Sequence, residues 1–158
     1  MAIRTIRTEG DEILKKKSKK VEVIDEKIIE LINDMIETLH KYEGVGLAAV
    51  QVGILKQIVV IQEAEDKPIH VIINPEIISQ SGTQIVEEGC LSFPKKFAKI
   101  ERPENIKIRA INEKGKKIEI SGKGLLAQAI SHEVDHLNGI VFVTKIIPGT
   151  LQYVEPEN

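Results

Sequence analysis

The sequence of 158 residues has no tryptophan, two tyrosines and three phenylalanines, so aromatic residues make up only 3% of it. This is too few for a platform on which single-stranded bases stack. The sequence also has no excess of positive charge: it contains 22 lysine and arginine residues and 24 aspartate and glutamate residues, for a net charge of −2. Nucleic-acid-binding domains carry a clear basic surplus. We therefore expect no DNA partner.

Long apolar runs are absent as well. No stretch approaches the ~18 apolar residues that cross a bilayer, and residues 1–9 lack the apolar core of an export signal. The single cysteine, Cys90, cannot form an internal disulfide, which favours a reducing compartment. These absences predict a cytoplasmic protein with no membrane partner.

The sequence pattern clearly predicts one helix, and it gives no sign of a boundary between domains. Neither a repeat nor a linker rich in proline, glycine or serine interrupts it, so we expect a single domain over residues 1–158. After Asp25, a good N-cap residue, apolar residues recur at helical spacing. This pattern predicts an amphipathic helix that ends near Tyr42 and Gly44.

Runs of apolar and β-branched residues between turn signals predict strands. They cover residues 57–62, 70–74, 83–86, 106–111 and 117–120. The glycine-containing loop between the last two favours an antiparallel hairpin. A second, mostly apolar helix should run from about Lys123 to Leu137, with Ser121 as its N-cap. The expected fold class is therefore α+β, with antiparallel β-sheets packed around a central buried helix.

That second helix carries a candidate metal site. His132-Glu133-Val134-Asp135-His136 fits the His-Glu-x-x-His pattern. With 3.6 residues per turn, the two histidines lie on one helix face about 6 Å apart along the axis, so both rings can bind one ion. Glu133 flanks that face as a candidate proton-transfer group. The alternative is a pair of core histidines with hydrogen-bonding partners.

A metal held by two histidines needs at least a third protein ligand. No histidine follows His136, and Glu155 lies beside a proline near the chain end, where backbone is rarely held rigidly. The remaining strong donor is the thiolate of Cys90. A set of one cysteine and two histidines leaves a fourth position for water, which is typical of catalytic rather than structural sites.

The segment Gly-Val-Gly-Leu-Ala-Ala-Val-Gln at 44–51 also matches a dinucleotide-binding pattern. That pattern requires a strand before it and a long helix after it, whereas this segment follows a helix and reaches Gly53 within a few residues. We therefore reject a dinucleotide site. Backbone that must approach another group closely accounts better for the glycines. Gln51, at the end of the segment, offers an amide N–H suited to stabilising an oxyanion.

Together, the segments 44–51, 88–92 (Glu-Gly-Cys-Leu-Ser) and 132–136 resemble the three signature motifs of the peptide deformylase family, in order and in spacing. The resemblance implies a hydrolase that removes the formyl group from the N-terminal methionine of newly made proteins and releases formate. It implies one divalent metal ion, Fe(II) in the cell, although Zn(II), Ni(II) and Co(II) also suit these ligands. Nascent N-formylmethionyl polypeptides are the expected partners.

The resemblance also assigns roles to single residues. The implied metal ligands are Cys90, His132 and His136. Glu133 acts as general base and then general acid while metal-activated water attacks the formyl carbon. Gln51 and the backbone N–H of Leu91 match the groups that stabilise the oxyanion. Gly46 matches the glycine whose backbone contacts the substrate peptide.

Further residues carry open alternatives. Leu125 and Ala129 are candidate walls of a methionine pocket, or plain core residues of a buried helix. Glu88 and Asp135 are candidates for orienting the ligands, or for an ion pair that stabilises the fold, so we leave both out of the catalytic set.

Several charged or ionisable residues are expected to have no part in the site. The five lysines between residues 15 and 20 should form a solvated face, with a transient ribosome contact through ribosomal RNA as the alternative. His40 and His70 have no neighbours at ligand spacing, and we expect them to be structural.

Two other functions remain open at this stage. A zinc endopeptidase would use His132, His136 and Glu155 as ligands, and Cys90 would then be dispensable. A binding module held together by a metal would do no chemistry, and Glu133 would then be dispensable.

Overall fold

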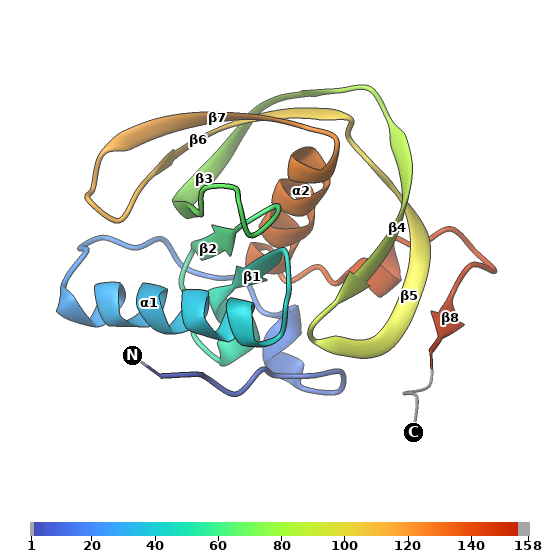
Figure 1. Cartoon of the computed structure of the whole chain (residues 1–158), viewed down its shortest axis with the longest axis horizontal. Helices are drawn as coiled ribbons and strands as arrows, with labels where there is room; N and C mark the ends of the chain where they lie inside the picture. Colours follow the sequence, from blue (N-terminus) through green and yellow to red (C-terminus); the bar gives the residue numbers. More distant parts are fainter. Residues whose placement is uncertain (1, 155–158) are drawn as a thin grey trace.

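The computed structural model describes residues 2–154, in which two antiparallel sheets enclose the helix α2 (Leu125–Leu137) (Figure 1). One sheet has five strands in the order β1-β2-β3-β6-β7, and the other has three in the order β4-β5-β8. The strands are β1 (Gly46–Ala48), β2 (Ile58–Ile61), β3 (His70–Ser81), β4 (Gln84–Cys90), β5 (Phe93–Arg102), β6 (Asn105–Ile111), β7 (Lys117–Lys123) and β8 (Gln152–Tyr153). Short 3₁₀ helices are η1 (Glu12–Lys15), η2 (Ala49–Val52) and η3 (Phe142–Thr144). The expected α+β class is confirmed.

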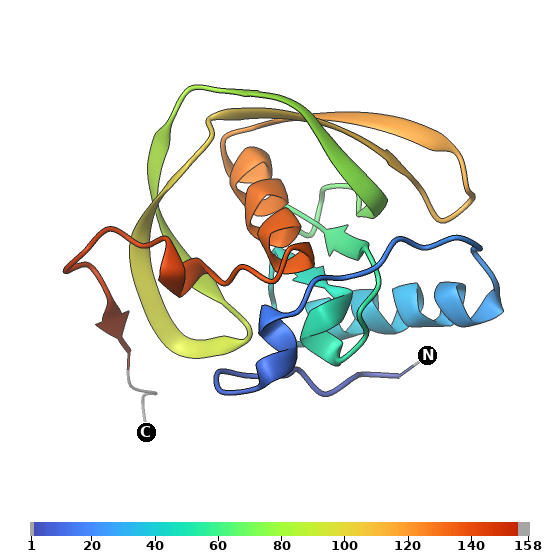
Figure 2. The ribbon, with the colours of Figure 1, turned by 180° about the vertical axis from the view of Figure 1, so that it is seen from behind.

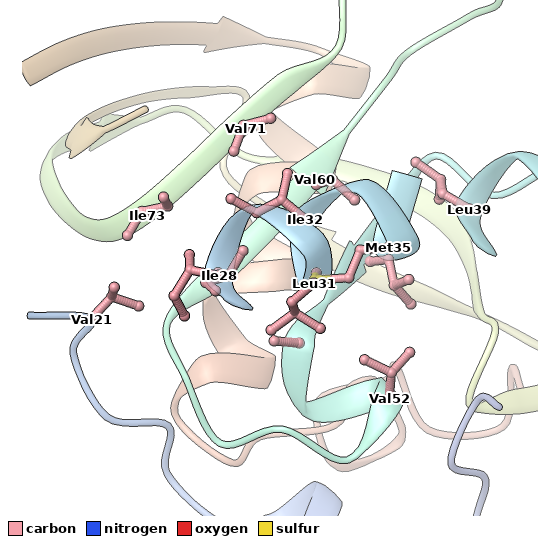
Figure 3. Close-up of a cluster of buried hydrophobic side chains, with 13 residues drawn as sticks. Val21, Ile28, Leu31, Ile32, Met35, Leu39, Val52, Val60, Val71 and Ile73 are labelled. Carbon is pink, nitrogen blue, oxygen red and sulfur yellow. The ribbon is translucent and has the colours of Figure 1, made fainter. Parts of the chain in front are cut away.

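Helix α1 (Glu26–Lys41) forms where the apolar spacing predicts it. The Asp25 carboxylate caps it by accepting a hydrogen bond from the Ile28 N–H at 3.0 Å. Its apolar face packs on β1 and β2 in a core cluster that also takes in β3 (Figure 3). Members of this cluster include Ile28, Leu31, Ile32, Met35, Leu39, Val60, Val71 and Ile73. Burial of this face, more than helix propensity, holds α1 in place.

Helix α2 lies between the two sheets, as Figures 1 and 2 both show. Its Ala127, Ala129 and Ile130 pack against apolar residues of the five-stranded sheet. Because α2 is covered on several sides, its polar residues must find partners inside the protein. Neither helix of the described residues has the length and apolar character needed to cross a membrane.

The start of α2 differs from the sequence-based expectation. Ser121 does not cap the helix, because it belongs to β7 and pairs with Lys107 of β6. Pairing with β6 satisfies the backbone as far as Lys123, so the helix begins only after Gly124, which turns the chain with a φ of +60°. The predicted hairpin of β6 and β7 is confirmed.

Several strands depart from the sequence pattern: β1 and β8 were not predicted, β4 continues to Cys90, and β3 and β5 differ most. β3 runs on to Ser81 instead of ending at residue 74, with irregular pairing to β6 after Ile73. β5 was not predicted, because its inward positions include the charged Arg102 and its first residues contain Pro94. The three-stranded sheet thus buries an arginine, although the alternation of polar and apolar residues in a strand assigns arginine to the surface.

Residues 2–9 form an extended N-terminal strap that runs across α1 toward the β4–β5 turn. The Ala2 N–H donates to Asp34 Oδ1 at 2.7 Å, and the Arg4 N–H donates to Thr38 Oγ1 at 2.9 Å. The Arg4 side chain also pairs with Asp34. These bonds fasten the strap to α1 at Asp34 and Thr38.

Candidate active site

Three possible metal ligands converge where β4 meets α2. Cys90 is the last residue of β4, and His132 and His136 lie one turn apart on α2. Their donor atoms all lie within 4.8 Å of one another, and Cys90 Sγ is 3.3 Å from His136 Nε2. The structure therefore brings together the three ligands expected from the sequence, although Cys90 is 42 residues from His132 along the chain.

The surroundings of this cluster fit a bound cation. Burial lowers the pKa of His136 well below its ordinary value, which keeps the ring neutral as a metal ligand must be. Burial would also lower the pKa of His132, but Glu133, Cys90 and Glu88 together raise it well above the ordinary value. One thiolate with two imidazoles suits a single divalent ion.

A buried ion-pair network supports His132 from behind. Glu88 Oε2 lies 2.7 Å from His132 Nδ1, which leaves Nε2 to face the cluster. Both oxygens of Glu88 also accept hydrogen bonds from Arg102, at 3.0 and 2.6 Å. Burial raises the pKa of Glu88, but the hydrogen bonds from His132 and Arg102 outweigh it and bring the pKa to about 2. Glu88 is therefore charged at any physiological pH.

Asp135 belongs to the same network, at 2.7 Å from Arg102 Nη1. Glu88 fits both alternatives, since it pairs with Arg102 and also contacts His132, whereas Asp135 fits the ion-pair alternative through Arg102 and Lys145. Sequence reasoning missed Arg102, which joins the two carboxylates. No motif marks it, because Arg102 lies in a stretch with many charged residues.

Glu133 faces the cluster from α2 and is 4% exposed. Burial raises its pKa to about 7. A carboxyl group with that pKa can accept and return a proton near neutral pH. A Cβ atom at Gly46 would lie only 2.6 Å from Glu133 Oε2. The glycines of residues 44–51 predict a close approach of the backbone to another group. That group is the Glu133 carboxylate, which lies beside β1.

Gln51, on η2, is 1% exposed and reaches the cluster from the other side. Its Oε1 accepts a hydrogen bond from the Ala48 N–H at 3.0 Å. Its Nε2 donates to Ser92 Oγ at 3.1 Å and lies 3.6 Å from Cys90 Sγ. Leu91 directly follows Cys90, so its main chain lies at the same place.

A cleft of about 730 Å³ opens onto the donor cluster. Its lining includes Gly46, Gln51, Cys90, Leu91, Leu125, Ala129, His132 and Glu133. Leu125 is 46% exposed in the cleft wall, so the alternative of a plain core residue is wrong for it, whereas Ala129 both lines the cleft and packs in the core. β1 is an edge strand of its sheet and borders the cleft. An extended peptide can therefore pair with its free edge.

The other residues singled out in the sequence lie elsewhere. His40 Nε2 is 2.7 Å from Gln62 Oε1, and His70 pairs with Ile61 at the end of β3. The lysines at 15–17, 19 and 20 are all exposed. Glu155, the third ligand of the endopeptidase alternative, lies outside the described residues.

The site combines one cysteine and two histidine donors, a buried carboxylate with a raised pKa and a cleft large enough for a peptide. This combination defines a mononuclear metallohydrolase. Comparison with known proteins identifies the family. Residues 3–151 match the family model for polypeptide deformylase. The chain belongs to this family, and it is a metal-dependent hydrolase that removes the N-formyl group from newly synthesised proteins.

Individual relatives agree over nearly the whole chain. Peptide deformylase 1 of Clostridium acetobutylicum is 55% identical, covering 92% of this chain and 96% of its own. Peptide deformylase of Alkaliphilus metalliredigens is 54% identical, with coverage of 93% and 99%. The crystal structure of a peptide deformylase from Legionella pneumophila superimposes with a TM-score of 0.90 at 44% identity, covering 93% of this chain and 88% of that one.

The network behind His132 can be tested by substitution. We expect Glu88→Ala to weaken metal binding by roughly 10- to 100-fold, because His132 loses the acceptor that orients it. The variant should also lose about 3–5 kcal/mol of stability, because the Arg102 guanidinium stays buried without its main partner. Competition with a chelator and urea unfolding measure the two effects.

Glu119→Ala is the matched control, because Glu119 pairs with Arg109 on the exposed surface of β6 and β7. It should change neither quantity appreciably. Equal metal affinity in the Glu88→Ala variant and the control would contradict the orienting role of Glu88.

Proposed function

We propose that Cys90, His132 and His136 hold the catalytic metal ion and that Glu133 moves the proton in this deformylation. The observation that carries the proposal is the convergence of these three donors and one buried carboxylate at the floor of an open cleft. A divalent ion bound there supplies Lewis-acid activation of water and of the formyl oxygen.

In this proposal Glu133 accepts a proton from the attacking water and later donates it to the departing amine of methionine. The water oxygen ends in formate, and the C–N bond of the formamide breaks. Gln51 Nε2 and the Leu91 N–H donate hydrogen bonds to the oxyanion that forms in between. Each of these groups lies on an element or turn that is packed in the fold, so the proposed mechanism needs no large movement.

Substrate placement follows from the walls of the cleft. We propose that the peptide pairs with the free edge of β1 at Gly46, so that its backbone rather than its sequence is recognised. The methionine side chain then lies against Leu125 and Ala129 of α2, which offer an apolar surface to an unbranched thioether. Recognition beyond methionine is expected to be loose.

Formate release from a formyl-methionyl tripeptide tests the chemistry. We expect activity in the metal-loaded wild type and a loss of at least about 100-fold in kcat for Glu133→Ala, because proton transfer of this kind contributes 10²–10⁴-fold. Metal content should be unchanged in that variant. Glu30→Gln, which changes an exposed carboxylate on α1, is the control and should retain full activity.

Each alternative function predicts a different result in the same assay. Cleavage of internal peptide bonds by Cys90→Ala would favour the zinc endopeptidase. Full activity of Glu133→Ala would contradict the role of its carboxylate, and a folded, metal-loaded wild type that releases no formate would favour the binding module.

For the metal itself we propose Fe(II) in the cell. The donor set also suits Zn(II), Ni(II) and Co(II), and intrinsic affinity does not favour iron, so availability decides. Protein purified without oxygen should contain iron and lose activity on exposure to peroxide, because a thiolate and a ferrous ion are both oxidisable. Zinc-loaded protein is the control. Equal peroxide resistance of the two forms would contradict the proposal.

We also propose that the protein works in the cytoplasm and contacts the ribosome transiently, since its substrate emerges there. Five exposed lysines, 15–17, 19 and 20, offer positive charge on one segment, and among residues 2–154 only Lys15 of these makes an ion pair, with Glu12 at 4.0 Å. Changing all five to glutamine should reduce cosedimentation with ribosomes at low salt and leave tripeptide activity intact.

Glutamine at three other exposed lysines, 114 and 116 of the β6–β7 loop and 117 at the start of β7, is the control for that experiment. An equal reduction per lysine removed with both sets would show nonspecific attraction. No reduction with the first set would exclude the lysine segment as the contact.

A further inference from the structure

Ser92 is a buried hydroxyl residue beside the site that the proposed mechanism does not use. It lies in the two-residue turn between Cys90 of β4 and Phe93 of β5 and is fully buried. Leu91 and Phe93 on either side line the cleft, whereas Ser92 does not. Its Oγ instead accepts the hydrogen bond from Gln51 Nε2 at 3.1 Å.

The backbone N–H of Ala48 fixes which way the Gln51 carboxamide points. The Ala48 N–H donates to Oε1, so that end must be the acceptor oxygen, and Nε2 must face Ser92 and Cys90. The reverse orientation would set the NH₂ group against a backbone N–H. One N–H of Nε2 bonds to Ser92, and the other is directed toward Cys90 Sγ at the donor cluster.

The N-terminal strap fastens the main chain of the same two residues. The Arg7 N–H donates to the Gln51 carbonyl at 2.7 Å, and the Glu9 N–H donates to the Ser92 carbonyl at 2.8 Å. The Glu9 carboxylate also pairs with Lys96 of β5. The strap thus connects η2, which directly follows β1 of the five-stranded sheet, to the β4–β5 turn of the three-stranded sheet.

From this arrangement we infer that Ser92 is a positioning residue for deformylation, whose hydroxyl holds the Gln51 carboxamide so that Gln51 Nε2 and the Leu91 N–H face one oxyanion. The inference rests on the proposed role of Gln51. Ser92 touches no substrate, and its effect on rate acts entirely through that amide. The strap keeps the distance between the two donors constant.

A double-mutant cycle on the metal-loaded enzyme tests this dependence. We expect Ser92→Ala to lower kcat about tenfold with KM within about twofold, less than the 10²- to 10³-fold that loss of an oxyanion donor costs. In a Gln51→Ala background the same change should cost less than about twofold, because the amide that Ser92 holds is already gone. Ser92→Thr, which keeps the hydroxyl, should recover activity relative to Ser92→Ala.

Ser18→Ala is the matched control, because Ser18 is another buried serine and its Oγ has no hydrogen-bond partner in the described residues. It should leave kcat unchanged. Equal losses from Ser92→Ala in both backgrounds would overturn the inference, as would wild-type kcat in Ser92→Ala alongside a slow Gln51→Ala. Wild-type kcat in Gln51→Ala would instead overturn the proposed role of Gln51 itself.

The wild-type enzyme offers a second measurement, for which no Ser92 variant has to fold. In zinc-loaded protein, the side-chain NH₂ signals of Gln51, identified by their absence in Gln51→Ala, should include one proton that exchanges slowly with water. Fast exchange of both protons would overturn the inference, because the bond to Ser92 protects one of them.

Discussion

The guanidinium of Arg102 is the point on which the rest of the site depends. It is 2% exposed and bridges Glu88 of β4 to Asp135 of α2. A charge in the protein interior is stable only when it is paired and hydrogen-bonded, so this residue fixes the distance between the three-stranded sheet and the central helix. Glu88 in turn holds His132. The position of His132 in the donor cluster therefore depends on this ion pair.

The cleft lies where segments of both sheets meet. Cys90 and Leu91 come from the three-stranded sheet, Gly46 and Gln51 from the β1 end of the five-stranded sheet, and the histidines from the helix between them. Such a boundary gives access to substrate, but within residues 2–154 no ladder of backbone hydrogen bonds crosses it. The Ser92 hydroxyl and the N-terminal strap connect its two sides at Gln51 and the β4–β5 turn. In the proposed function, rigid placement of the Gln51 and Leu91 donors avoids a reorganisation cost during the reaction.

The pKa values of the two buried glutamates of the site shift in opposite directions. Both lose solvation, which raises the pKa of each. Glu88 receives hydrogen bonds from Arg102 and His132 and stays ionised, whereas Glu133 receives no hydrogen bond from the residues that the structure describes and its pKa rises to about 7. One fold thus separates a permanently charged carboxylate beside His132 from a carboxyl group whose pKa lies near neutrality. Hydrogen-bond partners, not residue type, make that distinction.

The sequence by itself determined the local features. The spacing of His132, Glu133 and His136 on one helix face, the amphipathic α1 and the β6–β7 hairpin all follow from periodicity and turn residues within short windows. Cys90 was found by elimination. Only the tertiary structure decided that Arg102 is inside, that Ser92 holds Gln51, and that Ser121 belongs to a strand rather than a helix cap. These outcomes depend on contacts between residues 14 to 41 positions apart, where burial and strand pairing override the preference of each residue for the surface or for a cap.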